Sequence, residues 1–177
     1  MAGLRGAVAA LVLLLAAVLA AAEAKRPKLR CSAGLTLYAE GRLRVFGVPF
    51  HGGGEWGSDE YACLGARRRP LPVGVVSSNG GTGSLDTLAF AFGGGRYLGS
   101  YHTSDGEGGG EGWFAVVDLE TRRTVVEADA GWHDTAPPFR VAANGALITE
   151  DEDIEVRAPG SRHAKTLSTP GVTATDL

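Results

Sequence analysis

Hydrophobic residues in this chain occur in short runs of β-branched, aromatic and alternating positions. After residue 24, no window keeps an apolar i, i+3, i+4, i+7 stripe for three helical turns, and glycine and proline interrupt the chain every few residues. The pattern predicts an all-β protein, because many short strands joined by glycine-rich turns are typical of that class. We expect strands at residues 35–38, 43–48, 60–64, 72–76, 85–92, 97–101, 113–119, 124–128, 139–143, 146–150, 154–158 and 164–167.

The expected strands fall into similar units in which a tight glycine turn joins an apolar strand to the strand after it. These units open at Gly41, Gly95 and Asn144. The clearest hairpin lies at residues 116–126, where Asp118 and Thr121 suit the turn and valines flank it on both sides. A period of about 50 residues with four strands is typical of β-propeller blades. We therefore expect about three four-stranded, antiparallel, propeller-like sheets in a partial or atypical propeller.

Three segments carry a resemblance to known proteins: GRYLGSYH at 95–102, WFAVVDLETRRTVV at 113–126 and NGALITEDEDIEVRAPGSRHAKTL at 144–167. They resemble the blades of TolB-like β-propellers, and more closely a set of uncharacterised secreted proteins from actinobacteria. The resemblance covers most of residues 31–177 and implies a propeller-type fold and export. Its motifs are architectural, so it implies no functional residue. Three such units are fewer than the roughly four to eight blades of a typical propeller.

The first 24 residues have the layout of a secretory signal peptide. Arg5 gives a positive start, residues 7–22 form an Ala/Val/Leu run, and Ala22-Glu23-Ala24 offers an A-x-A cleavage site. The run is shorter than the roughly 20 residues that cross a bilayer, although an uncleaved N-terminal anchor is the alternative. We expect cleavage after Ala24, a secreted domain over residues 25–177, and no membrane anchor in the mature protein. A last strand at 172–177 would pair beside residues 35–38.

Cys31 and Cys63 are the two cysteines, and both lie in the exported part. An even number of thiols in an oxidising compartment predicts a disulfide. A metal pair or a catalytic thiol fits less well, because neither a CxxC motif nor paired histidines lie nearby. A bridge between Cys31 and Cys63 would close a loop of about 32 residues, which stabilises the fold by about 3 to 4 kcal/mol in the chain-entropy model.

The formal net charge of −3 argues against nucleic acid as a partner, since phosphate binding needs a basic stripe. The one dense basic run, residues 67–69, precedes Pro70 and is expected to be a solvated turn. No HExxH, GxSxG, P-loop or EF-hand motif occurs, and we expect no cofactor.

Loop aromatics and histidines are the candidate ligand-binding residues: His51, Trp56, His102, Trp132 and His133. No metal site is expected, although the glycine-rich acidic loop with Asp105, Glu107 and Glu111 is a candidate for calcium. The acidic run at 150–155 suggests a catalytic carboxylate pair, but a solvated turn explains it as well.

These observations favour a secreted, non-enzymatic, propeller-like binding module whose partner is an extracellular protein or a carbohydrate. One alternative is a secreted hydrolase or lyase that uses the loop carboxylates and histidines. Another is a fragment of a larger propeller. A pocket that brings His51, His102 or His133 within reach of two carboxylates would favour the enzyme.

Overall fold

The computed structural model describes residues 29–52, 54–65, 69–78, 83–106, 109–150 and 153–167. The expected signal peptide and the expected strand at 172–177 lie outside these residues. Within the described part the chain forms twelve β-strands and no helix. Each expected strand overlaps one observed strand, so the all-β prediction is confirmed.

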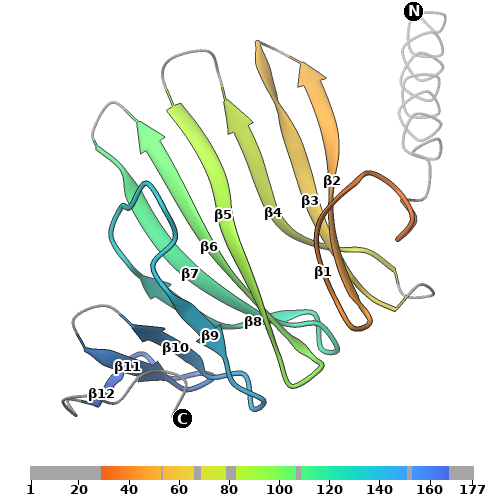
Figure 1. Ribbon diagram of the computed structural model, residues 1–177. Coiled ribbons are helices and arrows are strands. Elements are labelled where there is room, and N and C mark those ends of the chain that lie inside the picture. The colour runs from red at the N-terminus through yellow and green to blue at the C-terminus, as the bar shows by residue number, and fades with distance from the viewer. Residues whose placement is uncertain are drawn as a thin grey trace, which may run out of the picture.

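The first eight strands form one antiparallel sheet in chain order (Figure 1). They are β1 (Leu35–Glu40), β2 (Leu43–Gly52), β3 (Glu55–Leu64), β4 (Leu71–Ser78), β5 (Gly83–Gly93), β6 (Tyr97–Gly106), β7 (Glu111–Asp118) and β8 (Arg123–Asp129). The last four strands form a second antiparallel sheet: β9 (Phe139–Val141), β10 (Leu147–Glu150), β11 (Ile154–Arg157) and β12 (Lys165–Leu167).

The division into eight and four strands differs from the expected sheets of four strands each. The reason is a short junction, because β4 and β5 pair at Ser77–Leu85 and Ser78–Ser84. Away from this junction the two halves of the large sheet separate and face each other. We call β1–β4 the first half-sheet, β5–β8 the second half-sheet and β9–β12 the small sheet. The sheets do not close on themselves, and β1 and β12 lie at opposite sides of the molecule (Figure 1).

Apolar side chains fill the space between the two half-sheets. Leu43, Val45 and Ala62 of the first half-sheet are at most 2% exposed and belong to one cluster with Leu98 and Leu119. Alternation along the strands places these residues on one face, as expected for a half-buried strand. A hydrophobic core therefore lies between the first and second half-sheets, although both belong to one continuous sheet.

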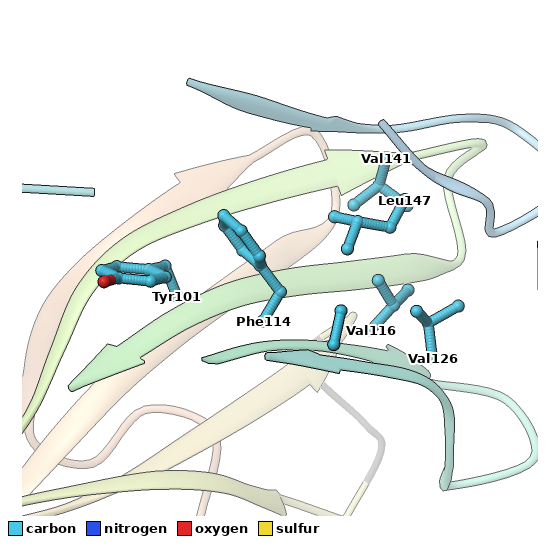
Figure 2. Close-up of a cluster of buried hydrophobic side chains, with 7 residues drawn as sticks. Tyr101, Phe114, Val116, Val126, Val141 and Leu147 are labelled. Atoms are coloured by element: carbon cyan, nitrogen blue, oxygen red, sulfur yellow. The ribbon is translucent and has the colours of Figure 1, made fainter. Parts of the chain in front are cut away.

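A second core joins the opposite face of the second half-sheet to the small sheet. Tyr101, Phe114 and Val116 belong to one cluster with Val141 and Leu147 (Figure 2). The central layer is thus covered on both faces, and the described chain forms three layers in sequence order. This order positions the loops that leave β8 and β10 at the edge of the second core.

Residues 29–34 cover the outer face of the first half-sheet. Cys31 is joined to Cys63 of β3 by a disulfide with a Cα–Cα distance of 5.8 Å. Both cysteines pack with Phe46 in a third cluster. The predicted disulfide is confirmed, and it links the start of the first unit to its third strand.

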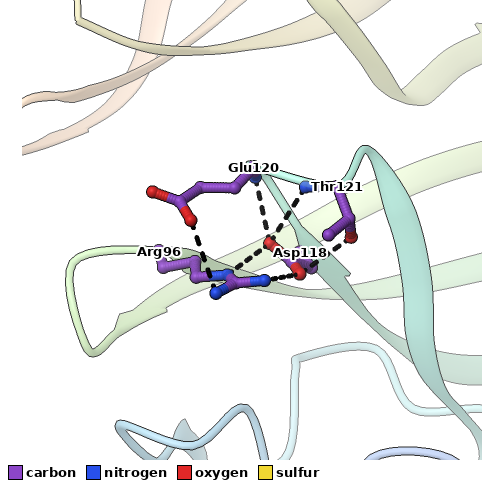
Figure 3. Close-up of polar contacts among 4 residues, drawn as sticks. All are labelled: Arg96, Asp118, Glu120 and Thr121. Atoms are coloured by element: carbon purple, nitrogen blue, oxygen red, sulfur yellow. Dashed lines mark hydrogen bonds and ion pairs between the residues drawn. The ribbon is translucent and has the colours of Figure 1, made fainter.

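An ion pair between the partly exposed Arg96 and the buried Asp118 holds the turn of the β7–β8 hairpin. The guanidinium of Arg96 donates to both carboxylate oxygens of Asp118, with Nε 2.7 Å from Oδ1 (Figure 3). Asp118 also accepts a bond from the Thr121 hydroxyl at 2.8 Å and one from the Glu120 backbone N–H at 3.0 Å. Arg96 therefore holds the pKa of Asp118 well below its usual range, the Thr121 and backbone bonds lower it further, and burial opposes them.

Candidate functional site

A groove lies between the second half-sheet and the small sheet, with a volume of about 370 Å³. Phe114, Ala128 and Leu147 give it an apolar base. Among the described residues, its polar lining consists of Thr149 and the ionisable residues Asp129, His133, Glu150, Asp153, Glu155 and Arg157. Four carboxylates against one arginine make the groove acidic. We call it the inter-sheet groove.

The register of the small sheet explains the groove's mixed lining. Leu147 pairs with Arg157 and Thr149 pairs with Glu155 across β10 and β11, so all four share one sheet face. On that face Leu147 packs into the second core, whereas Thr149, Glu155 and Arg157 give the groove its polar lining. The acidic run at 150–155 is thus divided: Glu150 and Glu155 lie in strands, and Asp153 lies between them in the described part.

The loop after β8 forms another wall of the groove and is anchored from below by Tyr101. The Tyr101 hydroxyl donates to the Gly131 carbonyl at 3.0 Å and accepts a bond from the His133 backbone N–H at 3.2 Å. The Ala130 N–H donates to the Gly112 carbonyl at 2.9 Å. A Cβ at Gly112 would lie 1.9 Å from the Gly131 oxygen, so only glycine allows this approach.

This anchoring presents Trp132 and His133 next to each other at the surface. The Trp132 side chain is 47% exposed, and its ring packs directly on the backbone of Gly110. His133 lines the inter-sheet groove, and its Nε2 lies 3.1 Å from the Ala130 carbonyl oxygen. Gly131, on the other side of Trp132, lines a neighbouring hollow that shares Ala128 and Asp129 with the groove. The two residues that flank Trp132 in the sequence therefore line two neighbouring hollows.

A second polar cluster is buried between the two half-sheets. His102 of β6 is 5% exposed, with Ser100 Oγ 2.7 Å from its Nε2 and Thr87 Oγ1 3.0 Å from its Nδ1. Its ring stacks on Trp113 at 5.4 Å between centroids. Glu60 of β3 completes the cluster and is 2% exposed. A Cβ at Gly74 would lie 2.5 Å from Glu60 Oε2, so this glycine makes room for the carboxyl group.

Burial is the largest cause of the pKa shifts of His102 and Glu60. It lowers the pKa of His102 to about 4, since the charged ring would lose its hydration. Burial raises the pKa of Glu60, the charge of Asp86 adds to that rise, and a hydrogen bond with Thr87 opposes it. Glu60 Oε2 has no hydrogen-bond partner among the described residues. The cluster is a buried polar connection between the two half-sheets.

The structure places the expected ligand-binding residues in three separate regions. His51 and Trp56 face each other across the β2–β3 hairpin, where Trp56 is 55% exposed. His102, expected beside a loop, is buried inside β6. His133 lines the inter-sheet groove, and Trp132 precedes it in the same exposed loop. The five residues therefore do not converge into one site.

The expected calcium loop is described in part. Asp105 lies near the end of β6 and Glu111 begins β7, whereas Glu107 lies outside the described residues. In the part of the chain that the structure describes, no three His, Cys, Asp or Glu side chains are grouped so that they could hold a metal ion.

Sequence reasoning did not single out Glu60, Thr87 or Ser100, and it did not connect Asp129 with the acidic run. For Glu60 a signal exists, because it lies two residues before Ala62 and four before Leu64 in β3 and so shares their core-facing side. For Asp129 no signal exists, since only the packing of the small sheet on the second half-sheet brings it near Glu155.

Comparison of the chain with protein-family models, with curated proteins and with solved structures finds no match in any of the three. Among the described residues, no helix has the length and apolar character that a membrane span requires.

Proposed function

We propose that this chain is a secreted, non-enzymatic binding module with a propeller-like arrangement of sheets, and that the inter-sheet groove binds a carbohydrate. Export is supported by the N-terminal sequence and by the Cys31–Cys63 disulfide, which fits an oxidising compartment. The propeller-like arrangement is supported by three successive sets of four antiparallel strands that pack face to face.

The observation that carries the proposed function is the inter-sheet groove beside an exposed indole. A sugar ring has an apolar face and a rim of hydroxyl groups, so it needs an apolar or aromatic surface next to planar hydrogen-bonding groups. Phe114 and Leu147 supply apolar base, and Asp129, Glu155 and Arg157 supply acceptors and donors. Trp132 directly precedes His133, which lines the groove. Its ring packs on Gly110, and Tyr101 bonds the backbone of both residues that flank it, so the exposed indole is held in place before a ligand binds.

A glycan array screened with the secreted protein, followed by calorimetry on the best glycan, tests the proposal. We expect Trp132→Ala to weaken binding about tenfold or more, because aromatic contact supplies a large part of such affinity. Trp56→Ala removes another exposed indole, from the first half-sheet, and is the matched control. Equal affinities of the two variants, or an array without a bound glycan, would contradict the proposal.

A hydrolase is the second candidate, and one observation favours it: His133 and four carboxylates line one groove. Cleavage of a glycosidic bond needs a carboxyl pair at about 5 to 10 Å across the substrate. Incubating the bound glycan with the protein and following its mass separates the two functions. Product formation that Glu155→Gln abolishes would replace the binding module by the enzyme, whereas an unchanged glycan supports binding alone.

A further inference from the structure

A second groove lies on the outer face of the first half-sheet, where residues 29–34 meet the ends of β2 and β3. Its volume is about 680 Å³, and the Cys31–Cys63 disulfide lies in its wall. Arg30, Arg42, Arg44 and Arg69 line it, and no acidic residue does among the described residues. We call it the arginine groove. It concentrates positive charge in a chain whose net charge is −3.

Among the described residues, neutral acceptors hold Arg44 in this groove. Its guanidinium donates to the carbonyls of Cys31, Ala33 and Gly34, the last two at 2.9 and 3.0 Å, and its Nε donates to Thr36 Oγ1 at 2.8 Å. These bonds hold residues 31–34 in place without neutralising the charge. Arg44 therefore contributes a positioned cation to the groove.

The other three arginines are exposed and have no anionic partner in the described part of the chain. The ion pairs found there both belong to Arg96, which binds Asp118 and Glu120. Glu120 lines the hollow next to Arg69, but its carboxylate lies 3.4 Å from Arg96 Nη1. Arg30, Arg42 and Arg69 thus keep their donors available beside Arg44.

We propose that the arginine groove binds an anionic ligand that carries two or more phosphate or sulfate groups. The guanidinium of Arg30, Arg42 or Arg69 can present a planar fork of donors to two oxygens of a tetrahedral oxyanion, and a guanidinium is more weakly hydrated than an ammonium group. Arg44, whose donors already bond within the protein, adds positive charge beside them. Several arginines around one open groove suit a ligand with several charged groups. This site goes beyond the proposed function, because it lies on the first half-sheet and not at the inter-sheet groove.

The disulfide makes the site dependent on the redox state of the protein. Arg30 precedes Cys31, and Cys63 anchors that cysteine to β3, so the bond sets where Arg30 lies relative to Arg42. Reduction removes the covalent link between Cys31 and β3 and leaves this segment held by the Arg44 bonds and by packing. We expect reduced protein that is still folded to bind the anionic ligand more weakly than oxidised protein.

Calorimetric titration of the secreted protein with two probes tests the proposal. Tripolyphosphate represents phosphate, and a heparin-derived hexasaccharide represents sulfate. The test variant Arg42→Gln/Arg69→Gln and the control Arg123→Gln/Arg162→Gln remove the same charge from exposed arginines, the control pair lying outside the groove. We expect the test variant to lose affinity about tenfold or more and the control to change less than about twofold.

Affinity that falls between about 50 and 200 mM salt supports ionic contacts. Binding of tripolyphosphate alone assigns the site to phosphate, and binding of the hexasaccharide alone assigns it to sulfate. Absence of binding by both probes at low salt, or equal losses in the two double variants, would overturn the proposal. Circular dichroism of each variant checks that the β-structure is retained, so that a lost affinity is not mistaken for unfolding.

Discussion

The hydroxyl of Tyr101 donates a hydrogen bond of 3.0 Å to the carbonyl of Gly131, thirty residues further along the chain. Tyr101 is fully buried between the second half-sheet and the small sheet, whereas Trp132 and His133, which follow Gly131, are exposed. One core side chain therefore fixes the loop that forms a wall of the inter-sheet groove. Burial raises the pKa of this phenol, so it remains a donor at neutral pH.

Removing this hydroxyl should loosen the loop. Tyr101→Phe leaves the ring in the core but removes the bonds to Gly131 and His133, and we expect a loss of about 1 to 2 kcal/mol in the free energy of unfolding. Hydrogen exchange at His133 should become faster. Tyr61→Phe is the control, because among the described residues its ring stacks on Phe46 without a hydroxyl bond. Unchanged exchange in Tyr101→Phe would show that the loop is held by other contacts.

The Cys31–Cys63 disulfide should contribute strongly to stability. It closes a separation of 32 residues, for which the chain-entropy model gives about 3 to 4 kcal/mol. We expect a lower thermal midpoint for Cys31→Ser/Cys63→Ser than for the oxidised protein, and no reaction of the oxidised, denatured protein with a thiol reagent. Two reactive thiols in non-reduced secreted protein would exclude the bond.

The ion pair at the β7–β8 turn should matter because its acceptor is buried. Asp118→Asn removes the carboxylate charge that accepts bonds from Arg96 and Thr121, and we expect a loss of about 1 to 3 kcal/mol in urea denaturation. Glu127→Gln makes the same chemical change at an exposed position of β8 and should have almost no effect. Equal urea midpoints for the two variants would show that the turn does not depend on this charge.

The twelve strands could be predicted because glycine turns mark their ends and apolar residues mark their interiors. The disulfide could be predicted from two cysteines in a chain whose N-terminal sequence predicts export. The continuous large sheet could not, because it depends on the few pairs at the end of β4, including Ser77–Leu85. No periodicity in the sequence distinguishes that junction from a loop between separate sheets.

The candidate site was predicted in part, for a reason that His102 illustrates. The expected strand ended at Tyr101, since the residues after it are polar. In the structure β6 continues to Gly106, and Ser100 and His102 share the face of Leu98 that packs on the first half-sheet. Polar residues are buried there because they bond with one another, and that pairing across β5 and β6 is not visible in one strand's pattern.

The buried imidazole of His102 predicts a specific acid sensitivity. An unfolded histidine has a pKa of about 6.5, whereas burial lowers the pKa of His102 to about 4. Between these values the unfolded chain binds one more proton than the native protein, so the free energy of unfolding decreases as the pH falls. The stabilising contribution is complete above about pH 6.5, and at about 1.4 kcal/mol per pKa unit it loses up to about 3 kcal/mol by pH 4.

Two other groups titrate differently and can be separated from His102. Asp118 has a lowered pKa, so its contribution is lost only below the ordinary value of 3.8. Glu60 has a raised pKa, and its contribution has the opposite sign, since it is present at low pH and lost as the pH rises through the native value. Measurements between about pH 7 and 4.5 therefore contain the His102 effect and, opposing it, part of that of Glu60.

Replacing His102 by glutamine isolates the imidazole, because the amide can bond with Ser100 and Thr87 but does not titrate. We expect the thermal midpoint of the wild-type protein to fall more steeply between about pH 6.5 and 4.5 than that of His102→Gln. His163→Gln removes an exposed histidine and should keep the wild-type slope. If His102→Gln and the wild type lose stability with the same slope, the burial of a neutral His102 is not the source of acid sensitivity, and the polar cluster does not couple protonation to the packing of the two half-sheets.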